Sequence, residues 1–164
     1  MNDTKTLKGL DNVLRQLQSL PPEIVSKRGG PVKSGLRKGA VVIRDEWKRR
    51  VQAIVDAPNK GDVPTKSLGI LKESIIATRN SKPHLIGANE AYRVRIKGKV
   101  AYPKYRGKNV TPYGVGSMLE RGTERRPPMP WATPGYFTTR DAALAAAVDE
   151  MNKRIAAVIR KMRR

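Results

Sequence analysis

The sequence predicts a single α+β domain over residues 1–164, with a small antiparallel β-sheet packed by a long central helix and a long C-terminal helix, joined by extended loops. Two periodicities carry this prediction. Apolar residues recur in steps of three and four over about 31–55 and 138–162, which is the spacing of one helix face. Apolar and basic residues alternate over 92–102, which is typical of a strand with one wet face.

The first half of the chain predicts two helices. A short amphipathic helix is expected over 11–20 and stops at Pro21. Pro31 suits the first turn of a longer helix that runs to about Val55. The apolar stripe of this longer helix consists of Leu36, Ala40, Ile43, Trp47, Val51 and Ile54. We interpret Trp47 as a core residue because it lies in this stripe.

The middle of the chain predicts a turn of helix and two strands. Pro and Gly punctuate residues 56–66, which we expect to form a mobile or interface-forming loop. A short helical turn over Ser67–Ser74 precedes a strand that begins at Ile75–Arg79. Residues 80–89 fit a turn between strands, in which His84 is exposed rather than catalytic.

A row of like charges accompanies the best-patterned strand, Tyr92–Tyr102. Its apolar parity is Tyr92, Val94, Ile96, Val100 and Tyr102, and its basic parity is Arg93, Arg95, Lys97 and Lys99. Lys104, Arg106 and Lys108 continue the charge into the following loop. Since like charges along one face repel each other, this row favours contact with a polyanion, and exposure to solvent alone is the open alternative.

The last third predicts a long loop and the C-terminal helix. Residues 103–117 are rich in Gly, Pro and Tyr, so we expect another mobile or interface-forming loop. Thr138 is expected to cap the final helix, with Asp141 completing a capping box. The apolar stripe of that helix consists of Leu144, Val148, Met151, Ile155, Val158 and Met162.

Composition excludes several classes of protein. The chain has 34 Lys+Arg against 14 Asp+Glu, a formal charge of +20, which favours polyanionic partners. With no Cys and a single His, thiolate chemistry, disulfides and multi-His metal sites are excluded. Glu120 and Glu124 lie among Arg121, Arg125 and Arg126, which indicates ion pairing rather than acid catalysis. We therefore expect no catalytic residues, metal, cofactor or small-molecule substrate.

No apolar run is long enough to span a membrane, and the first residues lack a signal-peptide core, so a cytoplasmic location is expected.

Three segments resemble one family in their order and spacing. They are Leu7-Lys8-Gly9-Leu10-Asp11, Thr65–Ile75, and a closing block made of Tyr113, Leu119-Glu120-Arg121-Gly122-Thr123 and Pro128-Met129-Pro130-Trp131-Ala132-Thr133-Pro134. This pattern is similar to that of the neck or tail-completion proteins of long-tailed double-stranded-DNA bacteriophages, often described as minor tail components. The resemblance covers roughly Leu7 to Met162.

The resemblance implies a virion structural protein of the head–tail junction, assembled in the host cytoplasm. It implies a homohexameric ring on the DNA path, with head-closure or connector proteins and tail terminator or tail tube proteins as neighbours. Residues expected to face the lumen and its DNA are Arg93, Arg95, Lys97, Lys99, Lys104, Arg106 and Lys108. Residues expected at oligomer or partner interfaces are Tyr113, Glu120, Arg121, Gly122, Thr123, Arg125, Arg126, Pro128, Pro130 and Trp131.

Two alternatives stay open at the level of function, and one at the level of a residue. A tail terminator that caps the tube is the alternative within the same setting. A free, sequence-independent nucleic-acid-binding protein is the alternative from another class, and it would bind DNA as a monomer with a steep salt dependence. Trp131 either packs into the core of its own chain or anchors an interface from a proline-stiffened loop.

Overall fold

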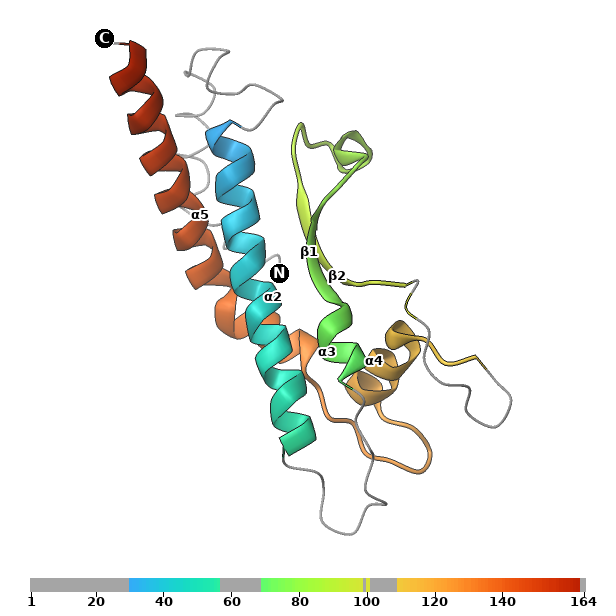
Figure 1. Ribbon diagram of the computed structural model, residues 1–164. Helices are drawn as coiled ribbons and strands as arrows, with labels where there is room; N and C mark the ends of the chain where they lie inside the picture. Colours follow the sequence, from blue (N-terminus) through green and yellow to red (C-terminus); the bar gives the residue numbers. More distant parts are fainter. Residues whose placement is uncertain (1–29, 57–68, 99, 101–108, 163–164) are drawn as a thin grey trace, which may run out of the picture.

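The computed structural model describes residues 30–56, 69–98, 100 and 109–162 (Figure 1). Its elements are α2 (Pro31–Asp56), α3 (Ile70–Ser74), β1 (Ile75–Arg79), the 3-10 helix η1 (Pro83–Ile86), β2 (Tyr92–Ile96), α4 (Pro112–Arg121) and α5 (Ala132–Met162). The α+β class is confirmed, as are the antiparallel sheet and the long central and C-terminal helices. The helix expected over 11–20 lies outside the described residues, as does 57–66 of the first expected loop.

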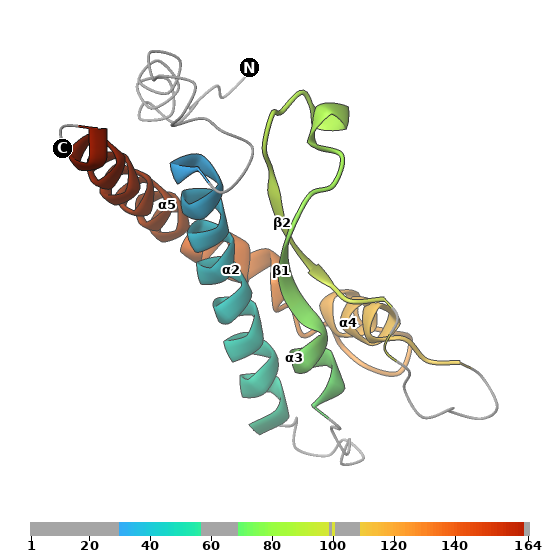
Figure 2. The same cartoon turned by 45° about the horizontal axis from the view of Figure 1, so that its top comes forward.

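Helix α2 forms the middle layer of the fold. It packs against α5 on one side and against the β1–β2 hairpin on the other (Figures 1 and 2). The helix pair runs antiparallel, since Gly35 meets Ala147 and Met151 whereas Trp47, further along α2, meets Gly135 near the start of α5.

Small residues set the distance between α2 and α5. A Cβ added at Gly39 would lie 2.7 Å from the backbone oxygen of Ala143, and one added at Gly35 would lie 2.5 Å from that of Ala147. Ala143 and Ala147 are themselves buried. The predicted stripe contains the buried Ala40 and Val51 of α2 but misses both glycines, because a residue without a side chain gives no hydrophobic signal.

The hydrophobic core sits at the end of the molecule where α2, α3, β1 and the start of α5 meet. Its buried side chains are Val51, Leu71, Ile75 and Trp131, and Trp47 packs against them. The rings of Trp47 and Trp131 meet edge to face, with centroids 5.4 Å apart and an interplanar angle of 83°. The prediction that Trp47 belongs to the core is therefore confirmed.

The hairpin has the predicted strands and a shorter second strand than expected. β1 pairs antiparallel with β2 in a register that joins Ile75 to Ile96 and Arg79 to Tyr92. The backbone N–H of Lys97 extends the pairing by donating to the oxygen of Ser74 at 2.7 Å. Regular strand structure ends at Ile96 rather than at Tyr102, and residues 101 and 102 lie outside the described residues.

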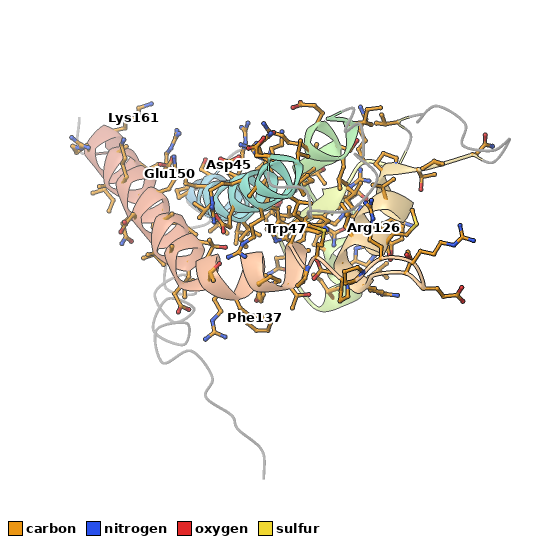
Figure 3. All side chains as sticks on the ribbon, turned by 90° about the horizontal axis from the view of Figure 1, so that it is seen from below. Asp45, Trp47, Arg126, Phe137, Glu150 and Lys161 are labelled. Atoms are coloured by element: carbon orange, nitrogen blue, oxygen red, sulfur yellow. The ribbon has the colours of Figure 1, made fainter. Side chains whose placement is uncertain are left out.

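Two boundaries predicted from the sequence are wrong. Residues 112–117, expected within a loop, form the first part of α4, with the Thr111 hydroxyl accepting from the N–H of Gly114 at 3.1 Å as an N-cap. Helix α5 begins at Ala132, so Thr138 lies inside it and does not cap it. Thr138 donates its hydroxyl to the oxygen of Pro134 at 2.9 Å. Such back-bonding bends helices, and α5 changes direction after its first turns (Figure 3).

Candidate assembly surfaces

The basic row lies on the outer face of the hairpin. Pairing places Arg95 beside Ile76 and Arg93 beside Thr78 on one face, while the opposite face, with Ile75 and Ile96, packs into the core. The side chains of Arg93, Arg95 and Lys97 are exposed, and none forms an ion pair with a described residue. The predicted exposed row is thus present at these three positions. Lys99, Lys104, Arg106 and Lys108 lie outside the described residues.

The one carboxylate of the hairpin is neutralised by its neighbour. Arg79 donates from Nε and Nη2 to the two carboxylate oxygens of Glu90, the second at 2.6 Å. These hydrogen bonds from Arg79 lower the pKa of Glu90, although its partial burial acts in the opposite direction. The negative charge of Glu90 is therefore compensated within the hairpin and leaves the basic row dominant.

Beyond this ion pair, the hairpin ends in an apolar tip. Leu85 and Ile86 of η1 are 72% and 67% exposed, the two highest values among the large hydrophobic side chains of the described residues. His84 is exposed beside them, as predicted. The sequence predicts only a connecting turn over residues 80–89 and gives no signal of this apolar tip.

Glu120 joins α4 to the start of α5. Its Oε2 accepts the backbone N–H groups of Trp131 and Ala132, both at 2.8 Å, and its Oε1 accepts that of Thr133 at 2.9 Å. Burial acts to raise the pKa of Glu120, but the hydrogen bonds from Thr133, Ala132 and Trp131 outweigh it, so the pKa is lowered. Glu120 is therefore a helix cap supplied from another element, and the expected ion pairing with the surrounding arginines is wrong for this residue.

The segment between Glu120 and Trp131 forms a tight reversal. Gly122 has φ +77°, and a Cβ there would lie 2.8 Å from the nitrogen of Pro128, so the turn requires glycine. Thr123 and Arg126 pair across the turn, with the N–H of Thr123 donating to the oxygen of Arg126 at 2.8 Å. This turn returns the chain to the core.

Trp131 belongs to the core, so its candidacy as an interface residue is wrong. It is 2% exposed, and its Nε1 donates to the backbone oxygen of Gly116 at 3.1 Å. Seven other interface candidates, however, have accessible side chains, of which only that of Arg126 is half-buried: Tyr113, Arg121, Thr123, Arg125, Arg126, Pro128 and Pro130. Their contact with a partner stays a prediction.

Helix α5 carries an aromatic pair that the sequence reasoning missed. Tyr136 and Phe137, the second of which is labelled in Figure 3, are both exposed. Their ring centroids are 5.5 Å apart, and the Arg140 guanidinium lies 6.0 Å from the centre of the Phe137 ring. No face was assigned to these residues because the predicted helix began at Thr138. Met118 on the exposed half of α4 is a further accessible apolar side chain.

An open hollow lies beside α2, and polar side chains that line it hydrogen-bond to one another. It measures about 460 Å³ and is lined by residues of α2 together with Lys72. Lys72 Nζ donates to Gln52 at 3.0 Å, and Gln52 donates to Asp56 at 2.7 Å. Within the described ranges, no three His, Asp or Glu side chains are grouped to hold a metal ion, and no helix is long and apolar enough to cross a membrane.

The sequence matches no family model, no curated protein and no solved structure.

Proposed function

We propose that this chain is a structural protein of the head–tail junction of a long-tailed DNA bacteriophage, a neck or tail-completion protein. It forms a homo-oligomeric ring, with six subunits, around the DNA path. The ring joins or completes the tail for attachment to the head. The proposal rests on the order of the three family-like segments and on the apolar surface that the single chain leaves open.

The open apolar surface is the observation that carries the proposal. Eight large hydrophobic side chains of the described residues are exposed: Val55, Leu85, Ile86, Tyr113, Met118, Tyr136, Phe137 and Ile159. Among the same described residues eight hydrophobic side chains are buried, and three of these are alanines. Single exposed apolar side chains such as Val55 and Ile159 occur on most protein surfaces, whereas grouped ones such as the contacting rings of Tyr136 and Phe137 are typical of a surface that a subunit buries against its neighbours.

The placement of these side chains supports a ring. Tyr113 and Met118 lie on α4, and Tyr136 and Phe137 lie on α5, so two elements of one subunit each present exposed apolar side chains. Head-to-tail contact between unlike surfaces generates a closed ring when the rotation closes. Exposed aromatic residues are also the side chains that dominate the binding energy of interfaces.

The basic row supports a position on the DNA path. In a ring, symmetry repeats Arg93, Arg95 and Lys97 around the axis, and cations in this arrangement contact phosphates without reading base sequence. Neighbouring connector, tail terminator or tail tube proteins would cover the surfaces that face along the axis.

Ring assembly is tested with the double variant Tyr113→Ser/Met118→Ser. Losing two anchors weakens each contact by at least about 2 kcal/mol, which raises the concentration needed for assembly roughly 30-fold. Sedimentation velocity over a concentration series measures this shift, and counting joined particles in a head–tail joining mixture measures the function. The matched control is Val55→Ser/Ile159→Ser, which removes apolar side chains of lower exposure and should assemble normally.

A wild-type chain that stays monomeric at every concentration and fails to associate with tail ends would overturn the proposal. Tight, steeply salt-dependent binding of duplex DNA by that monomer would establish the free nucleic-acid-binding protein instead. A virion map that places the chain away from the head–tail junction would also overturn it.

A further inference from the structure

We propose that the β1–β2 hairpin is a DNA-binding arm. Its apolar tip, Leu85 and Ile86, inserts between base steps of duplex DNA in the minor groove, while the basic row contacts the phosphates. This inference goes beyond the proposed ring, which needs only non-specific phosphate contacts. It can fail while the ring proposal stands.

The hairpin has the shape of an arm. Its base is fixed in the core, where Ile75 is fully buried and Val94 and Ile96 pack against the same cluster. From there it extends away from α3 and α4, so that η1 lies at the far end of the molecule from them (Figures 1 and 2). Leu85 and Ile86 therefore lie where they can enter a partner without moving the core.

The charge of the arm fits a polyanion. Residues 75–98 contain five cations, Arg79, Lys82, Arg93, Arg95 and Lys97, against the single carboxylate of Glu90. Arg79 neutralises that carboxylate through two hydrogen bonds. No uncompensated negative charge of the arm therefore opposes the approach of phosphates.

The length of the basic row favours DNA over a lipid surface. Alternate residues of a strand are about 6.6 Å apart, so Arg93, Arg95 and Lys97 form a column about 13 Å long. That column begins only after the tip, so it would lie above the headgroups of a bilayer in which the tip penetrated about 5–10 Å. When the arm lies along the minor groove of duplex DNA, by contrast, phosphate charges about every 1.7 Å of the axis run beside the whole column.

The combination of wedge and cations is the one that architectural DNA-binding proteins use. They insert Leu, Ile, Met, Phe or Pro between base steps and hold the backbone with Arg and Lys, which kinks the duplex. A second copy of this chain is a poorer occupant for the tip, because it would leave the cations of the arm without the phosphates that duplex DNA supplies.

The test measures binding and bending of a duplex of about 30 base pairs that carries a fluorescent donor and acceptor at its ends. The wild-type full chain should bind the duplex and shorten the end-to-end distance. Leu85→Ser/Ile86→Ser should bind within a few fold of wild type, with an unchanged salt slope, but should no longer bend the duplex. Arg93→Gln/Arg95→Gln/Lys97→Gln should lose about 2.7 from the slope of log affinity against log salt, or about 0.9 for each phosphate contact.

Matched controls separate these effects from general changes of surface. Val55→Ser/Ile159→Ser removes exposed apolar side chains outside the hairpin, and Arg37→Gln/Lys153→Gln/Lys161→Gln removes three exposed cations from α2 and α5. Both controls should bend DNA like the wild type, and the second should keep most of the salt slope. Circular dichroism confirms that each variant is folded.

Failure of the wild type to bind the duplex would overturn the inference, and so would full bending by Leu85→Ser/Ile86→Ser. If this variant bends DNA but no longer sediments with vesicles of phosphatidylglycerol, the tip is a lipid contact. If it bends DNA but no longer self-associates in sedimentation, the tip is a subunit contact. Lost bending with normal head–tail joining would support the arm and leave the ring proposal intact.

Discussion

The carboxylate of Glu120, in the last turn of α4, accepts the backbone N–H of Trp131 at 2.8 Å at the entry to α5. One short helix thus caps a long one, whose first residue, Ala132, lies twelve positions after Glu120. Since the same carboxylate also accepts two further N–H groups, it satisfies every backbone donor that the start of α5 leaves open, because the next residue, Pro134, has no N–H. It also places a negative charge at the positive end of the helix dipole.

Replacing Glu120 should therefore cost more than its surface position suggests. Glu120→Ala leaves three N–H groups without their acceptor, so we expect the free energy of unfolding to fall by about 2 kcal/mol. For a chain of this size the melting temperature should fall by roughly 4–8 °C, as measured by circular dichroism. Glu124→Ala is the control, because Glu124 is exposed and should change stability by less than about 0.5 kcal/mol. Equal effects of the two substitutions would contradict the capping role.

The lowered pKa of Glu120 makes its stabilisation dependent on pH. The folded chain binds this proton more weakly than the unfolded chain, in which the pKa is near the ordinary 4.5. The stabilisation is therefore fully present above that ordinary value and is lost as pH falls through the lowered pKa. Glu120→Gln does not titrate, so the difference in unfolding free energy between wild type and variant should shrink on acidification. Urea unfolding between about pH 7 and about pH 3 tests this, and a difference that stays constant would contradict it.

Replacing Gly39 by a larger residue should lower the free energy of unfolding, although glycine is a poor helix former. An added Cβ would lie 2.7 Å from the backbone oxygen of Ala143, which has no rotamer with which to move away. Overpacking of this kind costs about 1–3 kcal/mol, more than the roughly 1 kcal/mol of helix propensity that alanine adds. Gly39→Ala should therefore lower the urea midpoint. Gly114→Ala is the comparison, because its closest neighbour is the Thr111 hydroxyl at 3.3 Å, and it should be neutral or slightly stabilising.

The two tryptophans of the core should respond differently to the same substitution. Trp131→Phe removes the donor that satisfies the oxygen of Gly116, whereas Nε1 of Trp47 is buried with no partner among the described residues. Trp47→Phe therefore removes an unpaired polar group that costs stability, whereas Trp131→Phe removes a formed hydrogen bond. We expect Trp131→Phe to be more destabilising by about 2 kcal/mol in urea unfolding. Similar losses in the two variants would show that ring size, not hydrogen bonding, decides the outcome.

Local signals in the sequence predicted the elements whose causes are local. Pro31 marks the start of α2, and the alternation after Tyr92 gave both the strand and the exposure of Arg93 and Arg95. The start of α5 could not be predicted in this way, because its cap is Glu120, a residue of the preceding helix. The sequence before the apolar stripe that begins at Leu144 instead offers Thr138 as the capping residue of the helix.

Tertiary contacts explain the remaining differences between the predicted and the observed structure. Residues 112–117 look like a loop because they contain two glycines, a proline and a tyrosine. In the structure Pro112 suits the first turn of α4, and Gly116 lies where an added Cβ would be 2.7 Å from Ile96 and 3.1 Å from Trp131. The same residue explains why Trp131 is a core side chain and not an interface anchor. The exposed tip at Leu85 and Ile86 has no periodic signal, since it becomes visible only once the hairpin projects from the core.

The close contact of Gly35 and Gly39 of α2 with Ala147 and Ala143 of α5 also has a consequence for biosynthesis. Its two sides are separated by roughly a hundred positions in the chain, so α2 leaves the ribosome several seconds before α5 at about 5–20 residues per second. Of the elements that the structure describes before α5, α3 and the hairpin pack against α2 during that interval. Nascent chains arrested before α5 should therefore be cleaved by protease within α2, and they should become resistant once α5 has emerged.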